Sequence, residues 1–287
     1  MDALILGAGG QLGADLTRLL GDRAAALARA DADLARPDSI RDAIAKHRPR
    51  VVYNCAAFNF VDRAEREPEA AFAINALGVH HLAIACREAD ATLVHFSTDY
   101  VFGGDPTRTT PIDESVAPAP TCVYGVSKLT GEYLARLVPK HFVIRTCGVF
   151  GLAGRATQKG NFVEMIVRQI EQGKPLRVVT DQRCTPTFSA DLAAAAIQLV
   201  ETGRHGLHHV TNAGDCTWHE FAEEIVKLLG RDLPIQRMTT ADFGSPARRP
   251  SYSVLDCSAL AKLGLPAMRP WREALADYLR QRSGAKS

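Results

Sequence analysis

The sequence lacks the signals that mark several classes of protein. It contains no run of eighteen apolar residues, which argues against a membrane-spanning helix. Its formal net charge is only +2, so it has no basic excess of the kind that nucleic-acid-binding proteins show. Its seven cysteines are an odd number without a C-x-x-C pair, which indicates free thiols in a reducing compartment. We therefore expect a cytoplasmic protein with no membrane or nucleic-acid partner.

The histidines do not indicate a metal site. The sequence contains two adjacent pairs, His80-His81 and His208-His209. Adjacent residues on a helix or a strand point apart, so neither pair is arranged to hold one metal ion. We predict no metal ligands.

What the chain does have is a globular composition and a regular alternation of elements. Its 287 residues are 46% hydrophobic and 23% charged. Strands are expected at residues 3–6, 24–28, 51–54, 93–96 and 142–146, and helices at 11–20, 38–47, 67–89 and 126–137. This alternation predicts an α/β fold built on a doubly wound parallel sheet of the Rossmann type. Because the first expected strand begins at residue 3, we expect no signal peptide.

A glycine-rich turn follows the first strand. Gly7-Ala-Gly-Gly10-Gln-Leu-Gly13 lies between an apolar run and a helical segment, which is the context that a dinucleotide-binding fingerprint requires. Gly7 permits the tight turn, Gly10 lets the backbone approach a pyrophosphate, and Gly13 allows close packing of helix on strand. The pyrophosphate would lie at the helix N-terminus, where free N–H groups and the helix dipole favour an anion.

A tyrosine and a lysine lie four residues apart in Tyr124-Gly-Val-Ser-Lys128, and so share one face of a helix. An ammonium group held near a phenol favours the phenolate. We therefore expect Lys128 to lower the pKa of Tyr124 from about 10 towards neutral pH. A tyrosine tuned in this way exchanges a proton with a sugar or alcohol oxygen. The spacing alone also suits a solvated helix face.

A third motif, Ser97-Thr98-Asp99-Tyr100-Val-Phe102, follows an apolar strand. A hydroxyl group at the carboxyl end of a parallel strand faces the crevice where such sheets bind ligands. Thr98 is therefore placed to hydrogen-bond a substrate oxygen, and capping of the next segment is the structural alternative.

Together these three motifs resemble the extended short-chain dehydrogenase/reductases and, within them, the dTDP-4-dehydrorhamnose reductases. Further matches follow in order between residue 1 and about residue 280. They include Val61-Asp62-Arg-Ala-Glu65, Glu67-Pro68, Asn161-Phe162, Asp181-Gln182, Pro186-Thr187 and Arg249-Pro250. The resemblance implies an NAD(P)H-dependent reductase that acts on the 4-keto group of a nucleotide-activated 6-deoxyhexose. Conversion of dTDP-4-dehydrorhamnose to dTDP-rhamnose is the leading reaction.

The resemblance also implies roles for individual residues. Tyr124 would donate a proton to the carbonyl oxygen, Thr98 would polarise the carbonyl, and Lys128 would hold the nicotinamide ribose. The residues expected to bind the cofactor are Gly7, Gly10, Gln11, Leu12, Gly13, Arg29, Asp33, Leu34, Cys55, Ala56, Ala57, Tyr124 and Lys128. The residues expected to bind the nucleotide sugar are Phe60, Thr98, Asp99, Tyr100, Gly148, Asn161 and Arg249, and a homodimer is a possible assembly.

The form of the cofactor depends on residues just beyond the second strand. In this fold an acidic residue there selects NAD, whereas an arginine suits the additional phosphate of NADP. Arg29 lies at this point, with Asp31 and Asp33 close behind. We expect NADPH or NADH, with a slight preference for NADPH.

The domain organisation also follows from the resemblance. We place a dinucleotide-binding domain at residues 1–150, to which segments return from about 186–203. Most of residues 151–287 would form a smaller substrate domain, with helices expected at 161–172, 189–202 and 218–229 and a strand at 176–179.

Two departures from the family pattern affect the expected sugar pocket. The family sequence R-T-S-W-V-Y-G is Arg145-Thr-Cys-Gly-Val-Phe-Gly151 in this chain, so Gly148 replaces a tryptophan expected to line the pocket. In a second segment, residues 54–62, Phe60 adds a bulky side chain to another wall of the expected pocket. Because an aromatic wall carries much of a pocket's shape and burial, a substrate other than dTDP-4-dehydrorhamnose stays open at this point.

Two other functions stay open. An epimerase or dehydratase would use the same tyrosine and lysine with tightly held NAD, although a dehydratase carries Asp-Glu where this chain has Asp99-Tyr100. A non-catalytic regulator similar to the regulatory subunit of methionine adenosyltransferase would keep most of the motifs and also lack the tryptophan.

Three further charged residues are interpreted separately. We expect Asp62 and Glu65 to cap and solvate a helix start. We expect the planar guanidinium of Arg249 to meet the substrate diphosphate.

Overall fold

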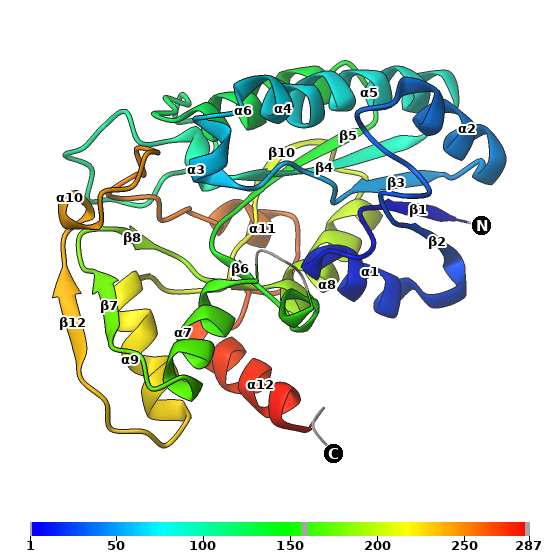
Figure 1. Ribbon diagram of the computed structural model, residues 1–287. Helices are drawn as coiled ribbons and strands as arrows, with labels where there is room; N and C mark the ends of the chain where they lie inside the picture. Colours follow the sequence, from blue (N-terminus) through cyan, green and yellow to red (C-terminus); the bar gives the residue numbers. More distant parts are fainter. Residues whose placement is uncertain (1, 157–159, 285–287) are drawn as a thin grey trace.

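A six-stranded sheet forms the upper part of the molecule in Figure 1, with the strand order β10-β5-β4-β3-β1-β2. The computed structural model describes residues 2–156 and 160–284. The strands of this sheet are β1 (Ala3–Leu6), β2 (Ala24–Leu27), β3 (Val51–Asn54), β4 (Thr92–Thr98), β5 (His141–Thr146) and β10 (Gly206–His209). Every neighbouring pair is parallel, which confirms the predicted fold class.

Helices cover both faces of the sheet (Figure 1). One face carries α2 (Pro37–His47), α4 (Pro68–Phe72), α5 (Gly78–Glu88) and α6 (Val123–Ala135). The other carries α1 (Gln11–Leu20) and α8 (Ser189–Glu201), with the short α11 (Ser258–Lys262) beside β10. Each helix buries an apolar stripe against the strands, as the periodicity of its sequence predicts.

The sequence prediction missed the edge strand β10. Its sequence, Gly206-Leu-His-His209, is short and half polar, so it has no apolar run to mark a strand. It is nevertheless fully paired in parallel with residues 142–145 of β5.

The predicted helix at 67–89 is present but not uniform. A π-helical turn, Ala73–Leu77, separates α4 from α5. By length and composition alone the run Pro68–Glu88 could cross a membrane, but half of its apolar window is buried inside the protein. A core helix of a soluble protein has the same composition.

The lower part in Figure 1 contains two-stranded sheets and several helices. The paired strands are β6 (Val149–Phe150) with β9 (Thr187–Phe188), β7 (Leu176–Val179) with β12 (Ile235–Met238), and β8 (Arg183–Cys184) with β11 (Cys216–Thr217). The helices are α7 (Phe162–Glu171), α9 (Trp218–Leu228) and α12 (Trp271–Gly284), while α3 (Val61–Ala64) and α10 (Thr240–Phe243) are short. Aromatic side chains from β6, β9, α9 and α12 pack together to form its core.

A buried ion pair fixes α6 on the sheet. Arg145 of β5 donates two hydrogen bonds to Glu132 of α6, at 2.8 and 2.7 Å. The side chains of both residues are at most 1% exposed. The Ser97 hydroxyl of β4 donates to the same carboxylate at 2.6 Å, so β4, β5 and α6 meet at one charged group.

We predict that Arg145→Leu lowers the free energy of unfolding by about 3–5 kcal/mol, because it leaves the Glu132 carboxylate buried without its cation. Lys140→Leu is the matched control, since it breaks the exposed ion pair between Lys140 and Asp90 at 2.7 Å. That variant should lose no more than about 1 kcal/mol. Urea unfolding measures both, and a loss below about 1 kcal/mol for Arg145→Leu would contradict the role given to the buried pair.

Candidate active site

The three residues predicted to be catalytic meet where β4 and α6 lie side by side. Thr98 is the last residue of β4, while Tyr124 and Lys128 lie on successive turns of α6. All three are buried. The Thr98 hydroxyl and the Tyr124 phenol interact with each other. The spacing in the sequence thus places two hydroxyl groups and an ammonium group on facing surfaces of a strand and a helix.

The expected lowering of the Tyr124 pKa is wrong for this structure. Burial raises the pKa of Tyr124 above its ordinary value, and the interaction with the Thr98 hydroxyl offsets this only in part. Lys128 is directed elsewhere: its Nζ donates to the Phe96 carbonyl at 2.6 Å. The phenol therefore keeps its proton at neutral pH.

Lys128 is held by the strand beneath it. Besides the Phe96 carbonyl, its Nζ lies 3.4 Å from Nε2 of His95, and the side-chain amide of Asn54 lies 3.1 Å from Nδ1 of the same ring. An ammonium group only donates, so Nε2 of His95 accepts from Lys128. Burial, and next the charge of Lys128, hold the pKa of His95 well below its usual range, which keeps the ring neutral.

Sequence reasoning missed His95 and Asn54. The available signal was a polar residue within each of two apolar strands, at positions 54 and 95. β3 and β4 pair Asn54 with His95 directly across the sheet.

Asp99 connects Thr98 to more distant segments. Its carboxylate accepts hydrogen bonds from the Thr98 hydroxyl at 3.1 Å, the Cys147 thiol at 3.0 Å and the Ser253 hydroxyl at 2.6 Å. Burial raises the pKa of Asp99, and these three donors oppose that shift. The Asp99 side chain, which we expected to bind substrate, thus holds Thr98 in place.

The residues expected to bind the dinucleotide surround the turn after β1. The strand order reverses at β1, whose neighbours are β2 and β3, and such a reversal is where open α/β sheets bind ligands. An ideal Cβ on Gly7 would lie 2.8 Å from the backbone nitrogen of Ala56, so the segment of Cys55, Ala56 and Ala57 after β3 borders the glycine turn. Leu12 and Leu34 are both buried, Leu12 in the core beneath α1 and Leu34 in the core on the opposite face of the sheet.

Arg29 lies at the surface beyond β2. Its side chain is 75% exposed and donates to Asp33 at 3.3 Å, an ion pair four residues apart. Asp31 instead accepts from the backbone of Ala28. The guanidinium is thus free to turn towards a ligand phosphate at small cost.

Asp62 does not cap a helix start, which corrects the expectation from sequence. Asp62 pairs with Arg249 in a two-point ion pair, at 2.7 and 3.0 Å, because the segment that follows α10 brings residue 249 beside α3. Glu65 does cap a helix, but a distant one: it accepts from the backbone of Val123 at the start of α6. The pair holds the pKa of the Asp62 carboxyl below its ordinary value, although burial opposes this.

Other residues predicted to bind substrate have structural partners. Asn161 caps α7 by accepting from the backbone of Glu164, and its amide donates to Gln11 of α1 at 2.8 Å. Phe60 packs edge-on against Phe58. Asn161 therefore links the start of α7 to the start of α1.

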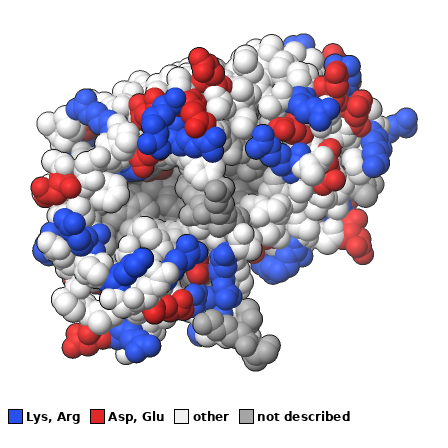
Figure 2. All heavy atoms as spheres, in the orientation of Figure 1, with Lys and Arg blue, Asp and Glu red and all other residues white. Residues whose placement is uncertain are grey.

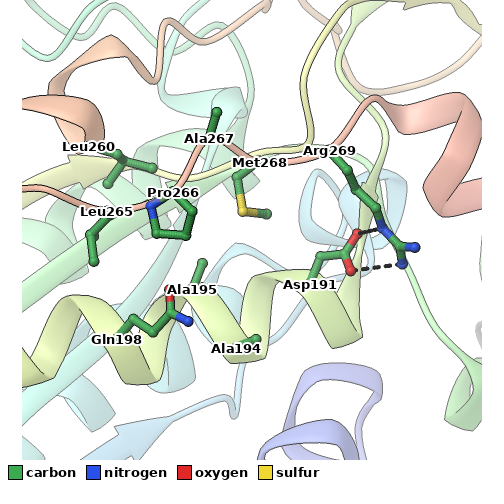
Figure 3. A pocket seen from close by; sticks show the side chains of 10 residues that line it. All are labelled: Asp191, Ala194, Ala195, Gln198, Leu260, Leu265, Pro266, Ala267, Met268 and Arg269. Atoms are coloured by element: carbon green, nitrogen blue, oxygen red, sulfur yellow. Dashed lines mark hydrogen bonds and ion pairs between the residues drawn. The ribbon is translucent and has the colours of Figure 1, made fainter.

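Cavities elsewhere do not contain these residues. One, of about 170 Å³, lies between α8 and residues 265–269, where Asp191 and Arg269 form the ion pair drawn in Figure 3. Another, of about 360 Å³, lies beside β10 and the outer side of α6. Across residues 2–156 and 160–284, no three His, Cys, Asp or Glu side chains form a group able to hold a metal ion.

The pKa of Lys128 leads to a prediction about stability. Burial lowers this pKa from 10.5 to about 8, although Glu132 acts in the opposite direction. Between these values the unfolded chain binds more protons, so stability should rise as the pH rises through that window.

We predict that the wild type gains up to about 3 kcal/mol between pH 8 and 10.5, relative to Lys128→Met. Urea unfolding of both proteins across this range measures the difference. Parallel pH profiles for the two proteins would show that Lys128 keeps its ordinary pKa in the folded state.

Comparison with known proteins identifies the family. The sequence signature described as the RmlD substrate binding domain matches residues 1–283. A dTDP-4-dehydrorhamnose reductase of Streptomyces griseus is 42% identical over 285 residues, 96% of this chain and 91% of that protein. The spore coat polysaccharide biosynthesis protein SpsK of Bacillus subtilis is 41% identical over 286 residues, 98% of each chain.

A solved structure agrees over the whole chain. The dTDP-4-dehydrorhamnose reductase of Bacillus anthracis, in complex with NADP, has a TM-score of 0.92 at 34% identity, and the match covers 98% of this chain and 100% of that one. The resemblance predicted from the motifs is confirmed, and the chain belongs to the RmlD substrate binding domain family.

Proposed function

We propose that this protein reduces the 4-keto group of a nucleotide-activated 6-deoxyhexose, with dTDP-4-dehydrorhamnose as substrate and dTDP-rhamnose as product. The observation that carries the proposal is that Tyr124 of α6 interacts with Thr98 at the end of β4, with Lys128 one turn further along α6. This arrangement offers a proton donor, a second hydroxyl group and a positive charge at the carboxyl end of a parallel strand. The names of the Streptomyces griseus and Bacillus anthracis relatives support it.

The glycine turn fits the pyrophosphate of a dinucleotide. The N-cap of α1 is Gly10, which has no side chain to cap the helix, and the first turn contains no acidic residue. The free N–H groups are therefore available to an anion. An ideal Cβ on Gly13 would lie 2.3 Å from the Gly7 carbonyl oxygen. The glycine turn therefore lies so close to α1 that there is no room for a side chain at position 13. The NADP bound to the Bacillus anthracis relative supports NADPH as the cofactor.

NADPH supplies the hydride when it is bound. Tyr124 would give its proton to the carbonyl oxygen as negative charge develops there, and its raised pKa ensures that the proton is present at neutral pH. Thr98 would hydrogen-bond the same oxygen. Lys128, with a pKa of about 8, would be mostly charged at neutral pH, and it would stabilise the developing negative charge and hold the nicotinamide ribose.

The surface between the two parts of the molecule suits a nucleotide diphosphate. Figure 2 shows a hollow there, with Lys and Arg side chains along both rims and Asp and Glu side chains among them. Basic residues around a hollow attract and orient a doubly charged substrate. We propose that residues 1–150 with returning segments hold the dinucleotide, and that most of residues 151–287 hold the nucleotide sugar.

Location and assembly stay predictions. We propose a cytoplasmic enzyme with no membrane or nucleic-acid partner. For the proposed homodimer, the exposed apolar side chains Leu77, Tyr133 and Leu137 on and beside α6 offer a contact surface. The sedimentation coefficient of the purified protein would distinguish a monomer from a dimer.

We predict that Tyr124→Phe lowers kcat for dTDP-4-dehydrorhamnose by about 10²–10⁴-fold, because the variant has no proton to donate. Oxidation of NADPH at 340 nm measures the rate. Tyr133→Phe, which removes the same hydroxyl group from an exposed tyrosine of α6, is the matched control and should react as the wild type does.

Two results would contradict the proposed function. Full activity of Tyr124→Phe would remove Tyr124 from the reaction. A wild type that binds NADPH and turns over no 4-keto-6-deoxyhexose would favour the non-catalytic regulator.

We predict that Gly13→Ala weakens NADPH binding by about tenfold or more, since the new Cβ would collide with the Gly7 carbonyl and displace the turn. Gly9→Ala is the matched control, because a Cβ there meets nothing within 4 Å. Its affinity should stay within about twofold of the wild type. NADPH fluorescence titration measures both affinities, and equal affinities would place the pyrophosphate elsewhere.

A further inference from the structure

Gly148 lies beside the proposed catalytic residues. β5 ends at Thr146, which is paired with Thr98 across the sheet. The next residue, Cys147, donates its thiol hydrogen to Asp99, which accepts from Thr98. Gly148 follows directly, so any group that covers it borders the same crevice.

An aromatic ring from a distant segment covers Gly148. The backbone φ of Gly148 is +53°, a conformation that other residues rarely adopt. An ideal Cβ there would lie 3.3 Å from Cη2 of Trp218 and 3.3 Å from Cα of Pro186. The tip of the Trp218 indole therefore occupies the space into which a side chain at position 148 would extend.

Trp218 is held rigidly, yet it is only half-buried. It is the first residue of α9, whose start is fixed by a capping box between Thr217 and Glu220. Its ring packs against Phe162, with ring centroids 4.7 Å apart, and Phe162 is half-buried as well. The other tryptophan, Trp271, is 1% exposed and belongs to the core.

The aromatic pair lies between the two halves of the proposed site. Phe162 follows Asn161, whose amide donates to Gln11 at the start of α1, where the dinucleotide pyrophosphate is proposed to bind. Trp218 contacts the position of Gly148, beside Asp99 and Thr98. The pair therefore spans from the cofactor end of the site to its catalytic end.

We infer that Trp218, supported by Phe162, is the apolar wall for the hexose ring of the nucleotide sugar. This inference rests on the proposed function. A 6-deoxyhexose presents C–H groups and a methyl group that gain free energy from contact with a flat, rigid apolar surface. Thr98 and Tyr124 supply polar contacts to one oxygen, and Trp218 determines the orientation of the ring that carries it. The wall thus comes from α9 in the lower part of the molecule. Gly148 has no side chain, and its position provides only the space that the indole ring occupies.

The two tryptophans of the chain make a direct test possible. Trp218→Phe and Trp271→Phe are matched variants, because each makes the same change to one ring. We expect dTDP-rhamnose to change the tryptophan fluorescence of the wild type and of Trp271→Phe, and to leave that of Trp218→Phe unchanged. We expect dTDP alone to produce little change in any of them, because it lacks the hexose. A response retained in Trp218→Phe, or an equal response to dTDP, would overturn the inference.

Calorimetry with Trp218→Ala provides a second measurement. We expect the dissociation constant for dTDP-rhamnose to rise at least about tenfold, while that for NADPH stays within about twofold. If the wild type binds no dTDP-rhamnose, the proposed function fails. If wild type and Trp218→Ala bind it equally well, only the role of Trp218 fails. Should Trp218→Ala not fold, the fluorescence of the two phenylalanine variants decides.

Discussion

The position of α6 depends on one buried charge. Tyr124, Lys128 and Glu132 recur every four residues and therefore face the sheet together. Glu132 is bound by Arg145 from β5 and by Ser97 from β4. Because a buried carboxylate is tolerated only with its partners in place, the helix cannot rotate or slide without losing them. Because Tyr124 lies on the same helix, the contacts of Glu132 also set the distance between the Tyr124 phenol and Thr98. One buried ion pair thus determines both the packing of α6 and the geometry of the proposed catalytic residues.

Burial separates the roles of the two ionisable groups on this helix. A phenol is neutral and an ammonium is charged, so the same apolar surroundings retain the proton of Tyr124 and weaken that of Lys128. A reductase needs a proton donor, and a buried phenol suits that task. The Phe96 carbonyl and the neutral His95 ring hold the ammonium, so a cation is retained in an interior that otherwise disfavours it. The site is thus built for the direction of reduction.

Local patterns in the sequence predicted the parts of the site that depend on neighbours along the chain. The four-residue spacing placed Tyr124 and Lys128 on one helix face, and the end of an apolar run placed Thr98 at a strand end. The pairing of Asp62 with Arg249 joins residues 187 positions apart, and no periodicity encodes it. Likewise, β10 owes its place to a free edge of β5 rather than to its own sequence. These local patterns could not predict which distant segments meet, because tertiary packing determines those contacts.

The strand order has a consequence for how the chain matures during synthesis. One edge of the sheet is closed by β10, and one face is covered by α8, yet both follow residue 188. When the first 150 residues have left the ribosome, β5 is an unpaired edge, and the apolar face that includes Ile5, Val94 and Ile144 has α1 but lacks the cover that α8 provides. Such an intermediate is prone to aggregate. A fragment that ends after β5 would therefore be a poor substitute for the whole protein, although it contains every proposed catalytic residue.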